Sequence, residues 1–464
     1  MDVVGEWSNT SRIIIIKRHP AGAQSLGSTS GENSMRCFPS KLHHIFLILF
    51  CCLFLQAAQA TDWPTFRGSS RTGIAPDTNL LESWPEEGPK LLWRSAGAGR
   101  GYASLAIVGD RIFTLGDGPS TASNDDEYLS CFDRITGKPI WHTKTGEAYN
   151  ENKKPSWNGS RSTPTISDGI VYVITPFGLL IGCDAETGEF GKAIDLKSAF
   201  GGTKDDAWGY SESVLIDGDK LVCTPGGSQT TMVALDKNNG DIIWKCAVPE
   251  DRGAGHASIV ISEIAGKKIY IQTTGSGAFA VDAETGKLQW TFPIEKTTAV
   301  IPTPIIKDDL VYFVAGYKRG GALIQQVPGP GGSVTSKEIF PLKKELANKH
   351  GGVILIDDHL YGCADSGTFI ISADLMTGEV VWKNRSDVGG KGSAAIVAAD
   401  GHLYVQWENG TFALVKADPA AFEEVSYFQI PDSGDSPCWA HPVIVDGMLY
   451  IRDGDNMFCY DIRK

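Results

Sequence analysis

The sequence lacks several patterns that identify common metal proteins and enzymes. The seven cysteines of residues 61–464 include no adjacent pair and no C-x-x-C pair, which argues against a zinc ribbon and a haem attachment site. A G-x-S-x-G motif, an H-E-x-x-H motif and a Walker loop are also missing. Cys131, Cys183 and Cys459 fall in apolar strand patterns, so we expect buried free thiols.

Long apolar stripes with a helical period are missing too, and short β-rich runs such as residues 169–174 take their place. This pattern predicts an all-β protein.

The chain has fewer basic than acidic residues. Residues 61–464 contain 37 Lys and Arg and 52 Asp and Glu, which gives a net charge of −15. Such an acidic chain is a poor partner for nucleic acid and for anionic membrane surfaces.

An apolar run near the N-terminus, residues 45–55, is too short to span a membrane as a helix. Basic residues precede it and Ala58-Gln59-Ala60 follows it, which is typical of a cleaved signal peptide. We expect residues 35–60 to be that signal, with export to the periplasm or the extracellular space and no transmembrane segment after cleavage. Residues 1–34 are either an over-extended gene start or a disordered leader.

Residues 61–88 are rich in Pro, Gly and polar residues, which argues against regular structure. Trp63, Phe66 and Trp84 nevertheless need burial. We predict an extended arm packed on the domain that residues 89–464 form.

A hairpin signature recurs through the rest of the chain. In residues 281–290 an apolar strand leads into an Asp-x-x-Thr-Gly turn and then a strand ending in Trp. The Asp carboxylate is expected to accept hydrogen bonds from the following backbone, and Gly supplies the positive φ. Because the Asp-to-Trp offset is always eight residues, we assign a structural role to these positions: Asp133, Gly137 and Trp141; Asp236, Gly240 and Trp244; Asp282, Gly286 and Trp290; Asp374, Gly378 and Trp382.

Eight such units follow one another, and the aromatic residues of their second strands lie about 48 residues apart. Four short antiparallel strands per unit predict an eight-bladed β-propeller, with seven blades as the alternative. Residues 458–461 look like a third strand with no fourth, and residues 89–94 like a fourth strand with no third. We expect these N- and C-terminal strands to pair and close the ring, which removes exposed sheet edges.

The repeat at residues 280–290, Ala-x-Asp-x-x-Thr-Gly-x-x-x-Trp, resembles the tryptophan-docking repeat of propellers of the pyrroloquinoline-quinone (PQQ) type. That class includes quinoprotein alcohol dehydrogenases and a non-catalytic outer-membrane assembly lipoprotein of Gram-negative bacteria. The opening residues 62–68, Asp-Trp-Pro-x-Phe-Arg-Gly, are similar to exported propellers of planctomycete-type bacteria. The resemblance covers nearly all of residues 62–464 and implies the fold, whereas function depends on the site.

The resemblance to quinoprotein dehydrogenases implies a defined set of active-site features. These enzymes have two adjacent cysteines over the cofactor, a catalytic Asp, and a carboxylate and amide set that holds calcium. Residues 61–464 contain no adjacent cysteines, and no motif here matches the calcium ligands. We therefore expect no cofactor, with PQQ and calcium as the alternative.

In a propeller, the loops that lead into the innermost strands surround one mouth of the central channel. Here these loops are rich in aromatic, basic and histidine residues although the chain is acidic, and convergent groups of this kind are typical of a binding site. The candidate ligand-binding residues are Arg100, Tyr102, Trp157, Arg161, Trp208, Tyr210, Glu212, His256, His350, Lys391, Trp439 and His441.

His256, His350 and His441 suggest a metal site, because imidazole is a common metal ligand. They belong to blades four, six and eight, which we expect to hold them too far apart to share an ion. We predict no metal and no catalytic set. The hypothesis is an exported, monomeric, non-catalytic binding or scaffold module that takes a protein, peptide or glycan at its channel mouth. The alternative is an enzyme: a PQQ-dependent dehydrogenase, or another propeller enzyme such as a lyase or hydrolase.

Overall fold

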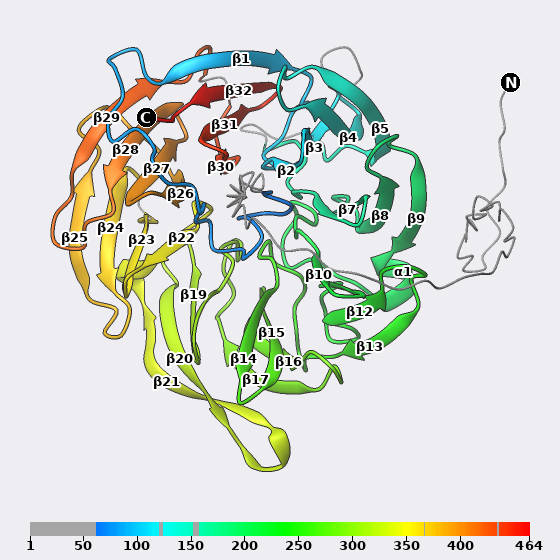
Figure 1. Ribbon diagram of the computed structural model, residues 1–464. Coiled ribbons are helices and arrows are strands. Elements are labelled where there is room, and N and C mark those ends of the chain that lie inside the picture. The colour runs from blue at the N-terminus through cyan, green and yellow to red at the C-terminus, as the bar shows by residue number, and fades with distance from the viewer. Residues whose placement is uncertain (1–61, 120–123, 152–156, 366, 434–435) are drawn as a thin grey trace, which may run out of the picture.

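The computed structural model describes residues 62–119, 124–151, 157–365, 367–433 and 436–464. In these residues, 32 strands form eight four-stranded antiparallel sheets arranged around one centre (Figure 1). This confirms the eight-bladed β-propeller and excludes the seven-bladed alternative. The predicted signal peptide, residues 35–60, and residues 1–34 lie outside the described residues.

The first four blades follow one another in chain order, and the strands of each run outward from the centre. Blade one contains β2 (Ala106–Val108), β3 (Arg111–Asp117), β4 (Asp126–Asp133) and β5 (Pro139–Glu147). Blade two contains β6 (Thr165–Ser167), β7 (Ile170–Ile174), β8 (Leu179–Asp184) and β9 (Phe190–Asp195). Blade three contains β10 (Leu215–Asp217), β11 (Lys220–Cys223), β12 (Met232–Asp236) and β13 (Ile242–Cys246). Blade four contains β14 (Val260–Ile264), β15 (Lys267–Thr274), β16 (Gly277–Asp282) and β17 (Leu288–Pro293).

The remaining blades complete the ring. Blade five contains β18 (Ile305–Lys307), β19 (Leu310–Ala315), β20 (Gly320–Pro328) and β21 (Val334–Lys343). Blade six contains β22 (Val353–Ile356), β23 (His359–Cys363), β24 (Phe369–Asp374) and β25 (Val380–Arg385). Blade seven contains β26 (Ala394–Ala399), β27 (His402–Trp407), β28 (Thr411–Lys416) and β29 (Glu424–Gln429). Blade eight contains β30 (Val443–Val445), β31 (Met448–Asp453), β32 (Asn456–Asp461) and β1 (Lys90–Ala96).

Helical structure is limited to short connections. The helix α1 (Leu196–Phe200) follows blade two, and 3-10 turns occur at Pro330–Gly332 and Lys344–Leu346. Across the described ranges, none of the helices has the length and apolarity that crossing a bilayer requires. The core consists of apolar side chains packed between neighbouring blades, as where Val222 and Tyr270 meet between blades three and four.

The repeated Asp-x-x-Thr-Gly turn is where neighbouring blades contact one another. In blade four, the backbone N–H and the hydroxyl of Thr285 both donate to Asp282 Oδ1 at 2.9 Å, and Gly286 has a φ of 71°. The Trp244 ring of blade three packs so closely on Gly286 that a Cβ there would lie 2.7 Å from it. Trp244 Nε1–H also donates to Ala283 O at 3.1 Å. The turn thus provides both a flat surface and an acceptor for the preceding blade's indole.

Blades five and seven depart from the repeat in sequence, yet the docking contact persists. Trp290 Nε1–H donates to Gln326 Oε1 of blade five at 3.3 Å, and Trp382 Nε1–H donates to Asp418 O beside blade seven at 3.1 Å. The indole therefore still finds an acceptor when the turn changes. In blade five, the hairpin of β20 and β21 is long and extends outward from the ring, as Figure 1 shows in yellow.

The ring closes through the two ends of the domain, as predicted. β1 pairs antiparallel with β32 in a register that places Lys90 opposite Asp461, and it forms the outermost strand of blade eight. The strand covers residues 90–96, two residues beyond the expected end at residue 94. Backbone hydrogen bonds between the first and last strands therefore hold the ring closed.

The N-terminal arm, residues 62–88, begins at the centre of the ring and continues outward to Ser426 of β29 (Figure 1, blue). The backbones of Trp63 and Ile107 of β2 exchange two hydrogen bonds of 2.8 Å. Further along, Ala75 N–H donates to Ala398 O of β26 at 2.8 Å. The arm therefore connects inner strands of blades that do not touch each other around the ring.

Two buried arginines fasten this arm. Arg71 donates to Ser213 O at 2.9 Å and to Ile259 O at 3.0 Å, next to blades three and four. Arg67 Nη2 donates to Val353 O of blade six at 2.6 Å. Burial lowers the pKa of each guanidinium to about 10, which leaves both charged at neutral pH. The arm is thus bonded to blades on several sides of the channel.

A candidate binding site at the channel mouth

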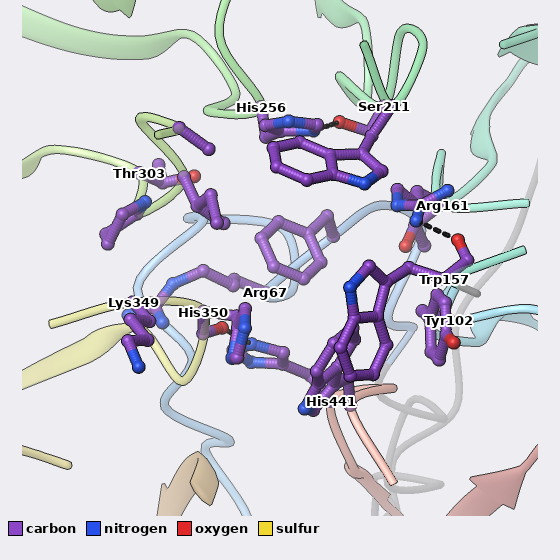
Figure 2. A pocket seen from close by; sticks show the side chains of 18 of the residues that line it. Arg67, Tyr102, Trp157, Arg161, Ser211, His256, Thr303, Lys349, His350 and His441 are labelled. Atoms are coloured by element: carbon purple, nitrogen blue, oxygen red, sulfur yellow. Dashed lines mark hydrogen bonds between the residues drawn. The ribbon is translucent and has the colours of Figure 1, made fainter. Parts of the chain in front are cut away.

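A cavity of about 440 Å³ lies at the channel mouth. Most of its wall comes from the loops that lead into the innermost strands, and the arm contributes Phe66 and Arg67 (Figure 2). Eight of the twelve candidate residues line it, from loops that lead into six different blades: Tyr102, Trp157, Arg161, Trp208, His256, His350, Trp439 and His441.

The other four candidates lie outside the cavity. Tyr210 is buried, and its hydroxyl donates to a backbone carbonyl at 2.8 Å. Glu212 is also buried and accepts from Thr224 N–H at 2.8 Å. Ser211, between them, lines the cavity, so successive side chains of this segment point to opposite sides. Lys391 is exposed to solvent and is not part of the cavity wall.

Arg100, the fourth, belongs to a polar network beside the mouth. Its Nη2 donates to Asp117 Oδ2 at 3.0 Å. Ser160 Oγ lies 2.8 Å from Asp117 Oδ1 and 2.7 Å from Glu127 Oε2. One hydroxyl proton cannot serve two carboxylates, so one of the acids carries a proton. Burial raises the pKa of Glu127 to about 8, whereas Asp117 has the Arg100 guanidinium beside it, and we assign the proton to Glu127.

Trp439 is the centre of an aromatic wall. Its ring centroid lies 4.8 Å from that of Tyr102, 5.1 Å from Trp157 and 4.3 Å from His350. The indole is fixed in place because its Nε1–H donates to Glu408 Oε1 at 2.8 Å. Packed, tilted rings of this kind form a rigid apolar surface against which another ring can stack.

Three cations line the same cavity. The Arg161 guanidinium lies 5.3 Å from the Tyr102 ring centroid, and Lys349 Nζ lies 5.5 Å from that of Tyr317. Arg67 reaches the cavity from the arm. Both ring contacts fall in the range of cation–π attraction. The cavity therefore combines positive charge with aromatic surface inside an acidic protein.

Ser211, His256 and Asp206 form a chain of hydrogen bonds, and Figure 2 shows the first two of them at the cavity wall. Ser211 Oγ lies 2.5 Å from His256 Nδ1, and His256 Nε2 lies 2.8 Å from Asp206 Oδ2. Burial lowers the pKa of His256, so the imidazole is neutral and its Nε2–H donates to Asp206. Burial opposes the charge on Asp206, but the hydrogen bond from His256 and the charge of Lys204 outweigh it and hold the pKa of Asp206 well below the usual range. Nδ1 is then free to accept the Ser211 proton, which is the arrangement of an activated nucleophile.

Two of the three candidate histidines, His350 and His441, are in contact through a backbone carbonyl. His441 Nε2–H donates to His350 O at 2.9 Å, because the loops before blades six and eight converge on the axis. Burial lowers the pKa of His350 to about 3 and that of His441 to about 4, so both imidazoles are neutral. In the part of the chain that the structure describes, no three His, Cys, Asp or Glu side chains are grouped as metal ligands.

Sequence reasoning missed several cavity residues. Phe66 and Arg67 come from the arm, and Tyr317 and Glu408 from loops between the second and third strands of blades five and seven. The distinctive motif at residues 62–68 contains the first two and is the signal that could have identified them. The other two sit in turns whose position at the mouth depends on the ring geometry.

Comparison with known proteins identifies the family of this chain. Residues 125–384, more than half of the sequence, match the family described as outer membrane protein assembly factor BamB. The chain belongs to this family. BamB of Shewanella oneidensis is 23% identical over 296 residues, which cover 62% of this chain and 66% of that protein. The dehydrogenase subunit of a quinone alcohol dehydrogenase from Gluconobacter oxydans is 26% identical over 235 residues, 47% of this chain and 30% of that protein.

The chain thus spans less than two thirds of the length of these two relatives. Among solved structures, BamB of Moraxella catarrhalis aligns with a TM-score of 0.54 at 18% identity, over 80% of this chain and 97% of that one. A europium-containing methanol dehydrogenase gives 0.59 at 12% identity, over 84% and 89%. At such identities the likeness establishes the fold of this BamB-family chain alone.

The quinoprotein relatives make a PQQ cofactor worth testing against the residues present. The resemblance implies adjacent cysteines and several oxygen ligands for calcium. The seven cysteines in the described residues are free and buried. Glu408 is the one carboxylate among the described residues that line the cavity, and it already accepts from Trp439. This set of groups does not fit a calcium-bound quinone.

Proposed function

We propose that this BamB-family chain is an exported, non-catalytic binding module that holds part of a protein, peptide or glycan partner in the channel-mouth cavity. The observation that carries the proposal is the convergence of loops from several blades, together with the arm, on one aromatic and cationic cavity. The family supports a binding role, since its description is that of an assembly factor. Export rests on the signal-peptide pattern at residues 35–60.

The size of the cavity limits what can enter it. At about 440 Å³ it falls within the range of small-ligand pockets, roughly 300–1,000 Å³. A side chain, a short peptide segment or a ring system of a partner fits such a space, whereas a folded domain contacts only the rim. The Trp439 indole is already held by Glu408, so binding requires little ordering of that side of the wall.

Replacing Trp208 with Ala tests the site. The ring lines the cavity, and its Nε1 has no hydrogen-bond partner in the described residues, so the change removes contact surface without breaking a bond. We expect Trp208→Ala, alone and combined with Trp439→Ala, to abolish partner capture in a pull-down from the exporting cell. The melting temperature should change little for Trp208→Ala.

Tyr427→Ala is the matched control. Tyr427 is an aromatic residue that is 50% exposed on β29, the outermost strand of blade seven. Its replacement should leave capture intact. Unchanged capture by Trp208→Ala together with loss of capture by Tyr427→Ala would place the binding site on a blade edge and refute the proposal.

A hydrolase is the second candidate, because Ser211 and His256 line the same cavity and His256 is hydrogen-bonded to Asp206. In this function Ser211 Oγ attacks an ester carbonyl carbon, and its proton passes to His256 Nδ1. The imidazolium then protonates the leaving alcohol, and water hydrolyses the acyl-serine by the same route in reverse. Asp206 holds the imidazole in place and stabilises its charge.

A fluorophosphonate probe separates this candidate from simple binding. An active nucleophile becomes covalently labelled at Ser211, and Ser211→Ala abolishes the label. Ser69→Ala, at an exposed position of the arm, is the control that keeps it. A wild-type protein that stays unlabelled refutes the hydrolase and leaves the binding module unaffected.

A further inference from the structure

We infer that the group bound in the cavity is acidic: a carboxylate attached to a ring whose apolar face can stack, with the carboxylate at Arg67 and Lys349 and the ring on the aromatic wall. The inference rests on the proposed function and adds the chemical class of the ligand.

The first support is the balance of charge. Of the described residues that line the cavity, Arg67, Arg161 and Lys349 are cationic, and Glu408 is the one carboxylate. Trp439 Nε1–H donates to Glu408 at 2.8 Å, so this carboxylate already has a donor. Residues 61–464 as a whole carry a net charge of −15. A local excess of cations in an acidic protein favours an anionic ligand over a neutral one.

The second support is an unmatched donor on Arg67. Its Nε and Nη2 donate to three backbone carbonyls, whereas Nη1 is buried and has no hydrogen-bond partner in the described residues. Nη1 packs against Gly352, where a Cβ would approach it to 2.3 Å, and His441 Cε1 lies next to the same glycine. A guanidinium N–H can only donate, and burying it unpaired is costly. A carboxylate oxygen is the acceptor that this position favours.

Lys349 supplies a second cation on the same side. It lies three residues before Gly352, which contacts Arg67, in the loop that leads into β22. Figure 2 shows Arg67 and Lys349 on one side of the cavity, with Trp157 and Tyr102 on the other. A ligand that bridges the two sides therefore needs an anionic end and a ring-shaped body.

Two kinds of compound carry this chemistry. Aromatic carboxylates offer a planar ring, and sugar acids offer a pyranose ring whose apolar face stacks on tryptophan. In both, the carboxylate meets the cations and the ring meets the aromatic wall, so the recognition is the same. Titration with one probe of each class distinguishes an aromatic acid from a sugar acid.

Isothermal titration calorimetry of the folded domain tests the inference with paired probes. 2-Naphthoate is compared with the neutral 2-naphthylmethanol, and glucuronate with glucose. We expect at least one acid to bind about tenfold or more tightly than its neutral partner, since hydrogen bonds to charged groups are strong. The difference should shrink as salt is added. Which pair shows it identifies an aromatic acid or a sugar acid.

Lys349→Met provides the variant, because its ammonium group contacts the Tyr317 ring, whereas Arg67 also holds the arm. It should remove most of the preference for the acid. Lys391→Met, an exposed lysine outside the cavity wall, should retain it. The inference would be overturned by any of three results. These are equal affinities for the acid and the neutral probe, failure of both acids to bind, and equal effects of the two lysine variants. The Trp208→Ala capture assay would still test the proposed function independently.

Discussion

Arg71 offers a quantitative test of how the arm holds the ring together. Its guanidinium donates to Ser213 O, Val214 O and Ile259 O, and to Thr65 Oγ1 at 3.2 Å. Arg71→Met keeps much of the side-chain volume but removes all four hydrogen bonds. Three buried backbone carbonyls at blades three and four then lose this donor.

The size of the effect follows from these bonds. A hydrogen bond to a charged group contributes about 1.5–3 kcal/mol, but bonds made by one guanidinium are not additive. Burial lowers the pKa of Arg71 to about 10, so relief of that burial offsets part of the loss. We expect the free energy of unfolding to fall by about 3 kcal/mol. With an unfolding entropy of about 2.1 cal/mol/K per residue, the melting temperature of a domain of this length falls by roughly 4 °C.

Denaturant unfolding and thermal melting of the variant and the wild type measure the change. Arg94→Met is the matched control, because Arg94 is 39% exposed and pairs with Asp432 at the surface. Exposed pairs of this kind contribute about 1 kcal/mol or less. If Arg71→Met costs no more than this control, the arm does not stabilise the ring in the way the contacts indicate.

Three further predictions concern a docking tryptophan, a buried acid and the cofactor. Trp244→Phe loses the hydrogen bond to Ala283 O and should cost about 1 kcal/mol in denaturant unfolding, whereas unchanged stability would show that the bond is dispensable. Glu127 has a folded pKa of about 8 against 4.5 ordinarily, so its contribution to stability is present below pH 4.5 and is lost as the pH rises through 8. The melting temperature of Glu127→Gln relative to wild type should therefore increase between pH 5 and 8, and a constant difference would refute the buried proton. Titration with PQQ and calcium should give neither calcium-dependent quinone absorbance nor alcohol-dependent dye reduction, and stoichiometric calcium-dependent binding with dye reduction would restore the dehydrogenase alternative.

The fold was predictable because its signals are local and repeated. The Asp-x-x-Thr-Gly turn around Asp282 and Gly286 needs only neighbouring residues, so its spacing reveals the blades. The closure of β1 on β32 also followed from the sequence, since each end had an incomplete set of strands. Blades five and seven obscured the pattern because Gln326 and Asp418 provide the acceptor for the docking indole in other ways.

The cavity was only partly predictable because it is assembled from loops of different blades. Choosing the mouth loops located Trp208 and Trp439, but the direction of each side chain depends on where extended backbone begins. Tyr210 and Glu212 are buried in the core, whereas Ser211 between them faces the cavity. The path of the arm follows from tertiary contacts such as those of Arg67, which no periodic pattern indicates.

Site-specific photocrosslinking in the exporting cell tests most directly whether the partner binds at the channel mouth. A benzophenone amino acid replaces Tyr317, which lines the cavity, or Tyr427, which is exposed on the outermost strand of blade seven. We expect a crosslinked partner from position 317 and none from position 427. Crosslinking from position 427 alone would contradict the assignment of the mouth as the binding site.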